Sequence, residues 1–142
     1  MVYHKLLTLK KYSNFQELER DISSISNDKE KGDVFEQFIK AYLLLNKQFY
    51  QIKEIYLFKE IPLVLKQKLK LETSDYGVDG VILFENEKLA TFQVKFRSNR
   101  ETATYRELAT FLGESFNSDY KYIFSNCYEL PEIMGKHSNL IT

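Results

Sequence analysis

The 142-residue chain has room for one hydrophobic core, and 44% of its residues are hydrophobic. Its 20 basic and 20 acidic residues give a formal net charge of zero, which argues against a protein that coats nucleic acid non-specifically. A single cysteine, Cys127, excludes an intrachain disulfide. Apolar runs such as 81–84 are too short to cross a bilayer, and the first residues lack the apolar stretch of a signal peptide. We therefore expect one soluble, cytoplasmic domain over residues 1–142, without membrane contact.

Two helices are expected in the first third of the chain. Residues 14–26 place Asn14 as a helix cap ahead of apolar residues at helical spacing. A polar, charged break is expected over 27–32, and Asp33 then opens a second helix with its own apolar stripe. Residues 1–30 are accordingly predicted to form an N-terminal helical extension of the domain.

The middle of the chain predicts strands. Residues 51–58 are aromatic and β-branched enough for a strand, and Pro62 opens either a short helix or a loop. Residues 81–84 and 89–96 are apolar runs around a polar tip, which indicates a hairpin. Within 89–96, apolar residues alternate with Thr91, Gln93 and Lys95. A period of two sends these three side chains to one common face.

A helix over 104–115 and a strand over 120–124 complete the pattern. Strand, helix and strand in this length form a crossover, which places the last strand parallel to 89–96. The expected order is helix, strand, strand, strand, helix, strand. This order predicts an α/β fold with a central mixed sheet flanked by helices, preceded by the N-terminal helix.

Oxygen ligands are expected to converge where Asp79 enters the hairpin. They are the carboxylate of Asp79, the amide oxygen of Gln93 and the backbone carbonyl of Val94. Hard oxygen ligands suit Mg²⁺ or Mn²⁺, with water completing the coordination shell. Lys95 would lie beside the metal, where its ammonium can orient an attacking water. Glu36 on the second helix is the natural further carboxylate, bound directly or through water.

Phosphodiester hydrolysis is the reaction that this set of residues fits. A cation lowers the pKa of a water and neutralises charge that grows on the phosphate. Hydrolysis of a phosphate ester can require upwards of ~20 kcal/mol of barrier reduction, so metal, lysine and positioning must act together.

Five stretches of the sequence carry a resemblance to a known family. They are KGDVFE (31–36), IYLFKEIP (55–62), DYGVDG (75–80), FQVKF (92–96), and YRELATF (105–111) leading to YIFSN (122–126). The chain resembles the PD-(D/E)xK, restriction-endonuclease-like nucleases, and among these the Mrr-like branch, in which glutamine commonly replaces the second acid. More narrowly, it is similar to the nuclease domain at the N-terminus of some restriction and phage-type helicases. The resemblance covers residues 15–126, and its specific part is Asp79, Gln93 and Lys95.

The resemblance implies a restriction-endonuclease-like αβββαβ core and a metal-dependent DNA endonuclease. It implies Glu36 and Asp79 as metal-side acids, Gln93 in place of the usual acid, and Lys95 as the catalytic lysine. Glutamine removes one negative charge, so metal affinity should be weaker unless Glu36 takes part. The implied cofactor is Mg²⁺ or Mn²⁺ and the implied partner is DNA. One site cuts one strand, so duplex cleavage requires a homodimer or two successive nicks.

Other residues have weaker functional interpretations. Arg97, Arg100 and Arg106 follow the lysine strand and could contact phosphates, but a solvated charge cluster explains them equally well. Asp75 more simply caps its loop than binds metal. His4 and His137 fit no metal spacing, so a zinc site is not expected. The chain has no G-x-x-x-x-G-K-[ST] phosphate loop, so a helicase motor would lie outside it, and we expect the chain to be a fragment of a larger protein.

Each candidate site residue also has a structural interpretation. Glu36 could be a solvated helix glutamate, and Asp79 a turn residue beside glycine. Gln93 and Lys95 could be ordinary exposed strand residues. Two rival functions follow: a catalytically inactive DNA-binding module of the same fold, and a protein-interaction domain in which the motif is incidental. An RNA substrate stays open, since no residue is identified that reads a 2′-hydroxyl.

Overall fold

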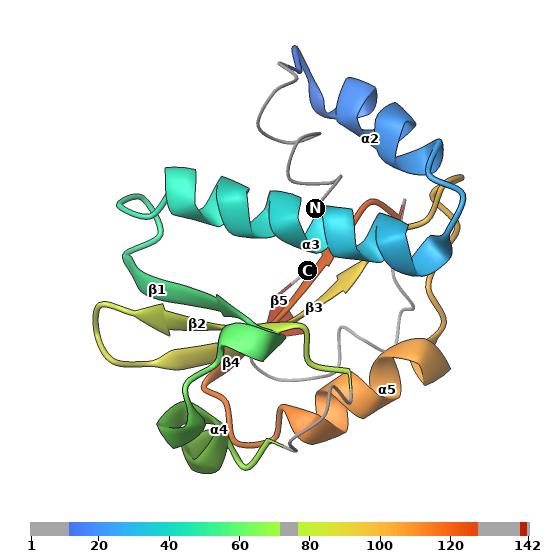
Figure 1. Cartoon of the computed structure of the whole chain (residues 1–142). Helices are drawn as coiled ribbons and strands as arrows, with labels where there is room; N and C mark the ends of the chain where they lie inside the picture. Colours follow the sequence, from blue (N-terminus) through green and yellow to red (C-terminus); the bar gives the residue numbers. More distant parts are fainter. Residues whose placement is uncertain (1–11, 72–76, 128–139, 142) are drawn as a thin grey trace.

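The computed structural model describes residues 12–71, 77–127 and 140–141. Its core is a mixed sheet of four main strands, and a two-residue strand adds to one edge (Figure 1). In spatial order the strands are β1 (Ile52–Leu57), β2 (Gly80–Phe84), β3 (Leu89–Lys95), β4 (Tyr120–Ser125) and β5 (Leu140–Ile141). The helices are α2 (Phe15–Ser23), α3 (Asp28–Leu45), the 3-10 helix η1 (Phe58–Glu60), α4 (Leu63–Leu69) and α5 (Tyr105–Glu114).

The sheet topology agrees with the sequence pattern. β1 and β2 pair antiparallel, β2 and β3 form the expected antiparallel hairpin, and β3 and β4 pair parallel with α5 as the crossover helix. The prediction of an α/β fold with a mixed sheet between helices is thus confirmed. β3 lies between β2 and β4, so both of its edges are covered by neighbouring strands.

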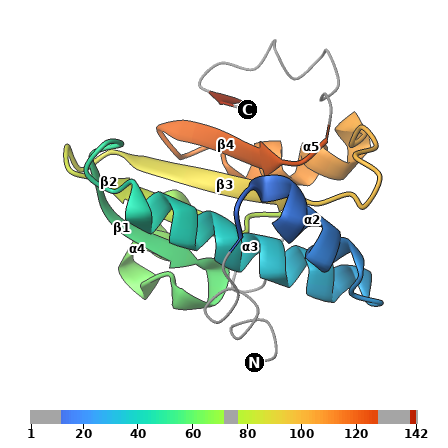
Figure 2. The same ribbon diagram turned by 90° about the horizontal axis from the view of Figure 1, so that it is seen from above.

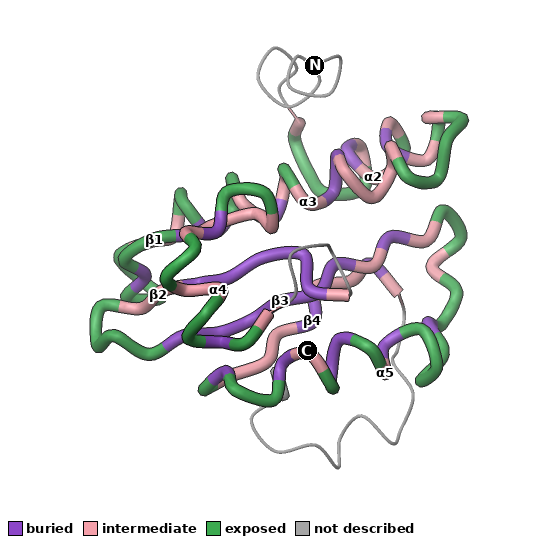
Figure 3. Tube along the Cα trace, turned by 60° about the horizontal axis from the view of Figure 1, so that its bottom comes forward, coloured by how far each residue is buried: buried purple, intermediate pink, exposed green. Residues whose placement is uncertain are grey.

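Helices cover both faces of the sheet. α2 and α3 lie on one face, while α4 and α5 lie on the other (Figure 1), and α2 runs alongside the N-terminal half of α3 (Figure 2). β3 contributes Ala90, Phe92 and Val94 to the core beneath α3. The alternate residues Thr91 and Gln93 are also buried, on the opposite face. β3 is therefore buried from Leu89 to Val94, whereas β4 is mostly half-buried (Figure 3).

The N-terminal helices differ from the expectation at one point. Asn14 caps α2 as predicted, because its Oδ1 accepts the N–H of Glu17 at 3.0 Å. The polar break expected over 27–32 is wrong, since α3 already begins at Asp28. Asn27 caps this helix by accepting the N–H of Glu30 at 3.2 Å. The charged residues 28–31 form the first turn of the helix, where the acidic Asp28 and Glu30 interact favourably with the helix dipole.

The structure decides between helix and loop after Pro62, and it contains one strand that was not predicted. The stretch that Pro62 opens is a helix, α4, and Lys70 ends it in the left-handed conformation at φ 56°. β5 was not expected; it pairs parallel with β4 through Leu140 and Ile141. Within the described ranges, no helix combines the length and apolar character needed to cross a membrane.

Candidate metal centre

Asp79 is fixed by backbone hydrogen bonds at the point where the chain enters β2. Its N–H donates to the carbonyl of Phe92 at 2.8 Å, and its own carbonyl accepts the N–H of Phe58 at 2.9 Å. The residue is only 8% exposed, so its carboxylate lies within the protein. A buried carboxylate needs hydrogen-bond donors or a cation to offset its lost hydration.

β3 supplies two of those donors. The side-chain Nε2 of Gln93 donates to Asp79 Oδ2 at 3.0 Å, and the backbone N–H of Val94 donates to the same oxygen at 2.7 Å. The structure thus brings Asp79 and Gln93 together, but through the amide nitrogen and not through the amide oxygen that the sequence prediction placed there.

The carbonyl oxygen of the Gln93 side chain is the unusual atom of this group. Gln93 is 5% exposed, and none of the described residues donates a hydrogen bond to its buried Oε1. Buried polar atoms without a partner are few in folded proteins and call for an explanation. A cation bound by Asp79 would give Oε1 a partner once the amide turns about its last torsion, so that Oε1 replaces Nε2 beside the carboxylate.

The backbone of Val94 adds a third oxygen. In an extended strand, the N–H and the C=O of one residue point to the same side. Because the Val94 N–H points to Asp79, its carbonyl lies on that side too, beyond the start of β2 at Gly80. A carboxylate, an amide oxygen and a backbone carbonyl are the ligand types that Mg²⁺ and Mn²⁺ accept.

This set of oxygen ligands carries little negative charge. Within residues 12–71 and 77–127, no three His, Cys, Asp or Glu side chains form a cluster that could bind a metal ion. Unless Glu36 takes part, an ion at Asp79 would be bound by one carboxylate and two neutral oxygens, so the affinity should be weak, as expected from glutamine at position 93. Asp75, His4 and His137 lie outside the described residues.

Glu36 is on α3, one helical turn before a residue that contacts η1. Lys40, one helical turn further on, forms an ion pair with Glu60 of η1 at 2.7 Å. η1 begins at Phe58, whose N–H is bonded to Asp79. Glu36 is half-buried on α3, next to the buried Phe35. Its predicted role as a metal ligand stays a prediction.

Lys95 ends β3 and is half-buried rather than enclosed in the core. Strand alternation places its side chain on the face of Gln93, opposite to Val94. The positive charge of Lys95 is one of the influences on the pKa of Glu107, in the first turn of α5. The N–H of Thr104 is the main cause that lowers the pKa of Glu107; burial opposes this, and the positive charges of Arg97 and Lys95 lower it further. Lys95 lies at the same end of β3 as Asp79, since Val94 beside it donates to the Asp79 carboxylate.

The three arginines suggested as phosphate contacts have different surroundings. Arg97 forms an ion pair with Glu107 at 2.7 Å, and Arg100 forms one with Glu19 at 2.6 Å. Arg106 is exposed on α5. DNA contact by these residues stays a prediction, and Arg106 is the one whose surroundings favour it most.

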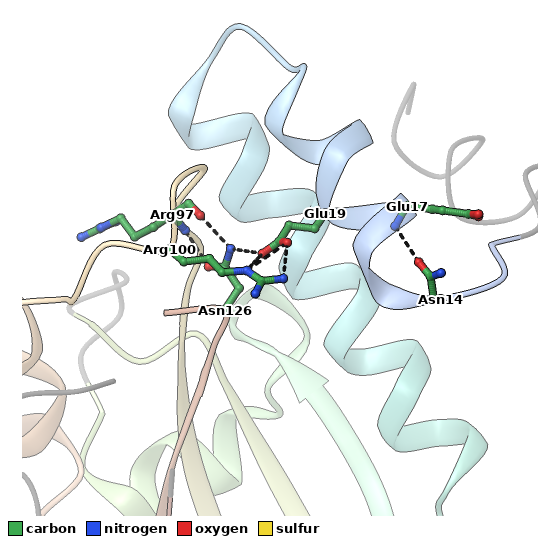
Figure 4. A network of polar contacts seen from close by, with 6 residues as sticks. All are labelled: Asn14, Glu17, Glu19, Arg97, Arg100 and Asn126. Atoms are coloured by element: carbon green, nitrogen blue, oxygen red, sulfur yellow. Dashed lines mark hydrogen bonds and ion pairs between the residues drawn. The ribbon is translucent and has the colours of Figure 1, made fainter. Parts of the chain in front are cut away.

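Sequence reasoning missed one polar group beside Lys95. Asn126, directly after β4, is 8% exposed and bonds the backbone of Arg97 and the side chain of Glu19 (Figure 4). Glu19 is 107 residues away from Asn126. No local spacing signals such a pair, and Ser-Asn after a strand looks like an ordinary turn.

An aromatic cavity lies elsewhere in the fold. It measures about 240 Å³ and is lined by residues of the C-terminal part of α3, of the turn that follows it, and of β1, β2 and β4. Its polar groups are the hydroxyls of Tyr42, Tyr50 and Tyr122, and none of the candidate site residues lines it. Size alone does not make it the chemical site, since the groups able to bind a cation lie at Asp79.

Comparisons with known proteins give one structural likeness. No protein-family model and no curated protein matches this sequence. The fold is similar to part of a solved structure described as the ATP-dependent Type ISP restriction-modification enzyme LlaBIII bound to DNA. The TM-score is 0.66 at 20% sequence identity, over 92% of this chain and 8% of that chain. A likeness at this identity concerns the fold, and the chain spans a small part of that enzyme.

Proposed function

We propose that this chain is a nuclease domain of the PD-(D/E)xK, restriction-endonuclease-like class, which hydrolyses DNA phosphodiester bonds with Mg²⁺ or Mn²⁺. One observation carries the proposal: the buried Gln93 amide bonds Asp79 through Nε2, while its Oε1 has no donor among the described residues. Lys95 follows on the same face of β3. An incidental motif gives no reason to bury an amide against a carboxylate with the amide oxygen left without a donor.

The fold supports the same class. The solved structure that the fold resembles is described as a restriction-modification enzyme bound to DNA. We infer from it a DNA substrate and a place for this domain within a larger, ATP-dependent protein. Because the match covers 8% of that enzyme, a motor in the same or a partner polypeptide is part of the proposal.

The site residues have separate roles in this proposal. Asp79, Gln93 and the Val94 carbonyl bind the cation, with Glu36 as a further acid. The cation supplies Lewis-acid stabilisation of phosphate charge and makes a water more acidic. Lys95 contributes a positive charge that stabilises the negative charge developing on a non-bridging phosphate oxygen during the reaction. β3 is buried from Leu89 to Val94, so the backbone that carries Gln93 and the Val94 carbonyl is held in place before the substrate arrives.

A nicking assay on supercoiled plasmid tests the proposal. Wild type should convert plasmid to the open-circular form with Mg²⁺ or Mn²⁺ and lose this activity with a chelator. Asp79→Asn keeps the shape and removes the charge, so it should lower the rate by about 10²-fold or more. The control is Lys68→Met, an exposed position on α4.

Two outcomes would contradict the nuclease assignment. Equal activity in wild type and Asp79→Asn would identify a contaminating nuclease. Metal-independent DNA binding without cleavage, unchanged by Asp79→Asn, would instead support an inactive DNA-binding module of the same fold.

A further inference from the structure

Asn126 prolongs the pairing between β3 and β4 beyond the last residues of both strands. Its backbone N–H donates to the carbonyl of Lys95 at 3.4 Å. Its side chain then acts in place of a backbone amide: Oδ1 accepts the N–H of Arg97, and Nδ2 donates to the Arg97 carbonyl, both at 2.7 Å. One buried residue therefore fixes the strand on both sides of Phe96, directly after Lys95.

A second set of bonds fixes Asn126 itself. Its Nδ2 also donates to Glu19 Oε2 at 2.7 Å, and Glu19 accepts from Arg100 through Nε at 2.9 Å and through Nη2 at 2.6 Å (Figure 4). We call Glu19, Arg97, Arg100 and Asn126 the Asn126 network. It connects α2 to the segment that follows Lys95, across 107 residues of sequence.

The loop after β3 is shaped by the same contacts. Arg100 has a left-handed backbone at φ 58°, which a non-glycine residue adopts only when its surroundings require it. Its N–H donates to the Arg97 carbonyl at 3.1 Å, the same oxygen that Asn126 Nδ2 binds. The ion pair with Glu19 thus stabilises a strained turn that begins two residues after Lys95.

We propose that Asn126 is the positioning residue for Lys95, and that Glu19 acts through Asn126. This inference rests on the proposed nuclease function. The direction of a strand side chain follows the backbone dihedrals of its residue and of its neighbours, so bonds to Lys95 and Arg97 set the direction of the lysine. Lys95 ends the regular strand, and without Asn126 its C-terminal side would have no partner strand.

The test measures single-turnover cleavage, with enzyme in excess of plasmid, for Asn126→Ala in two backgrounds. A displaced lysine should lower the maximal rate by about tenfold to a hundredfold, with the DNA affinity and the half-saturating Mn²⁺ concentration unchanged. In the Lys95→Met background, Asn126→Ala should have no further effect, because the group that it positions is gone. The control is Asn99→Ala, an exposed residue of the same loop, which should match wild type.

A milder variant and an NMR signal keep the test valid even where Asn126→Ala does not fold. Glu19→Gln keeps the shape of the network and should lower the rate several-fold, again only when Lys95 is present. In addition, the NMR signal of the Lys95 side chain, assigned by its absence in Lys95→Met, should shift on addition of DNA and Mg²⁺. That shift should be lost in Asn126→Ala and kept in Asn99→Ala.

The contradicting results differ for the two proposals. Equal losses of rate in both backgrounds, or no loss in either, would overturn the positioning role and leave the nuclease assignment intact. Absence of Asp79-dependent cleavage by wild type would overturn the nuclease assignment, and the positioning role with it.

Discussion

The amide nitrogen of Gln93 donates a hydrogen bond to Asp79 Oδ2 at 3.0 Å, so the amide oxygen is the atom turned away from the carboxylate. In this arrangement the amide hydrogen offsets the charge of the buried carboxylate. A half-turn of the amide about its last torsion exchanges oxygen for nitrogen and places Oε1 beside the carboxylate. Gln93 can therefore serve Asp79 as a donor without a cation and serve a cation as a ligand when one is bound.

Gln93→Glu should exchange stability for metal affinity. A second carboxylate next to Asp79 repels it in the buried site, so the metal-free variant should melt at a lower temperature than wild type. With Mn²⁺ the additional charge becomes a ligand, and calorimetry should find binding tighter by about tenfold. Gln67→Glu, exposed on α4, is the matched control and should change neither quantity. Unchanged Mn²⁺ affinity in Gln93→Glu would remove Gln93 from the metal centre.

Lys95→Met should reduce the rate and leave DNA affinity nearly intact. Methionine keeps the length of the side chain and removes only the charge that stabilises the phosphate. The maximal cleavage rate should fall by about 10²-fold or more, the size of loss seen when one stabilising group is removed. Filter-binding titrations should show less than a few-fold change in DNA affinity. A loss of affinity with an unchanged maximal rate would make Lys95 a binding residue.

Gly80→Ala should destabilise the fold strongly. A Cβ at Gly80 would overlap the ring of Phe92 and the carbonyl of Tyr56, and neither can move without displacing a strand. We expect a loss of about 3 kcal/mol or more in the free energy of unfolding, measured by urea denaturation. Gly32→Ala in α3 is the opposite case, since nothing lies within 4 Å of the added Cβ. It should stabilise by about 0.5–1 kcal/mol because alanine favours the helix.

The Glu19 ion pair should give the fold an acid-sensitive component. Hydrogen bonds from Arg100 lower the pKa of Glu19 below its usual 4.5; burial opposes this shift, and the Asn126 bond adds to it. Because the pKa is lower in the folded state, ionised Glu19 stabilises the protein above the unfolded pKa of 4.5. This stabilisation is lost as the pH falls through the lowered pKa of the folded state. Wild type should be more stable than Glu19→Gln by about 1 kcal/mol near neutral pH.

The difference in stability between wild type and Glu19→Gln, followed as a difference in melting temperature, should disappear as the pH falls below 4.5. A gap that stays constant down to the acid transition would show that the carboxylate charge of Glu19 contributes nothing. Glu17→Gln, on the same helix, provides the comparison for a general effect of removing an acid from α2.

Local patterns predicted much of the fold. The alternation in β3 identified the residues beneath α3 and placed Gln93 and Lys95 on one face, because a strand has a fixed period. The same patterns failed at residues 28–31, where charged side chains in a first helical turn look like a loop. β5 was not predicted, because a strand of two residues is too short to show an alternating pattern.

The site was predictable only as far as its spacing is local. Asp79 and Gln93 are 14 residues apart across one hairpin, so pairing rules alone bring them together. Arg100 and Glu19 are 81 residues apart and meet only after α2 has packed on α3. The sequence suggested Arg100 as a phosphate contact, but it could not show that a distant glutamate binds the guanidinium.

Crystals soaked in Mn²⁺ give the most direct test of the central claim, because the anomalous signal locates the ion itself. We expect a peak within coordination distance, about 2.0–2.4 Å, of an Asp79 carboxylate oxygen, Gln93 Oε1 and the Val94 carbonyl. No peak at Asp79, at a Mn²⁺ concentration that supports DNA cleavage, would contradict the proposed metal centre.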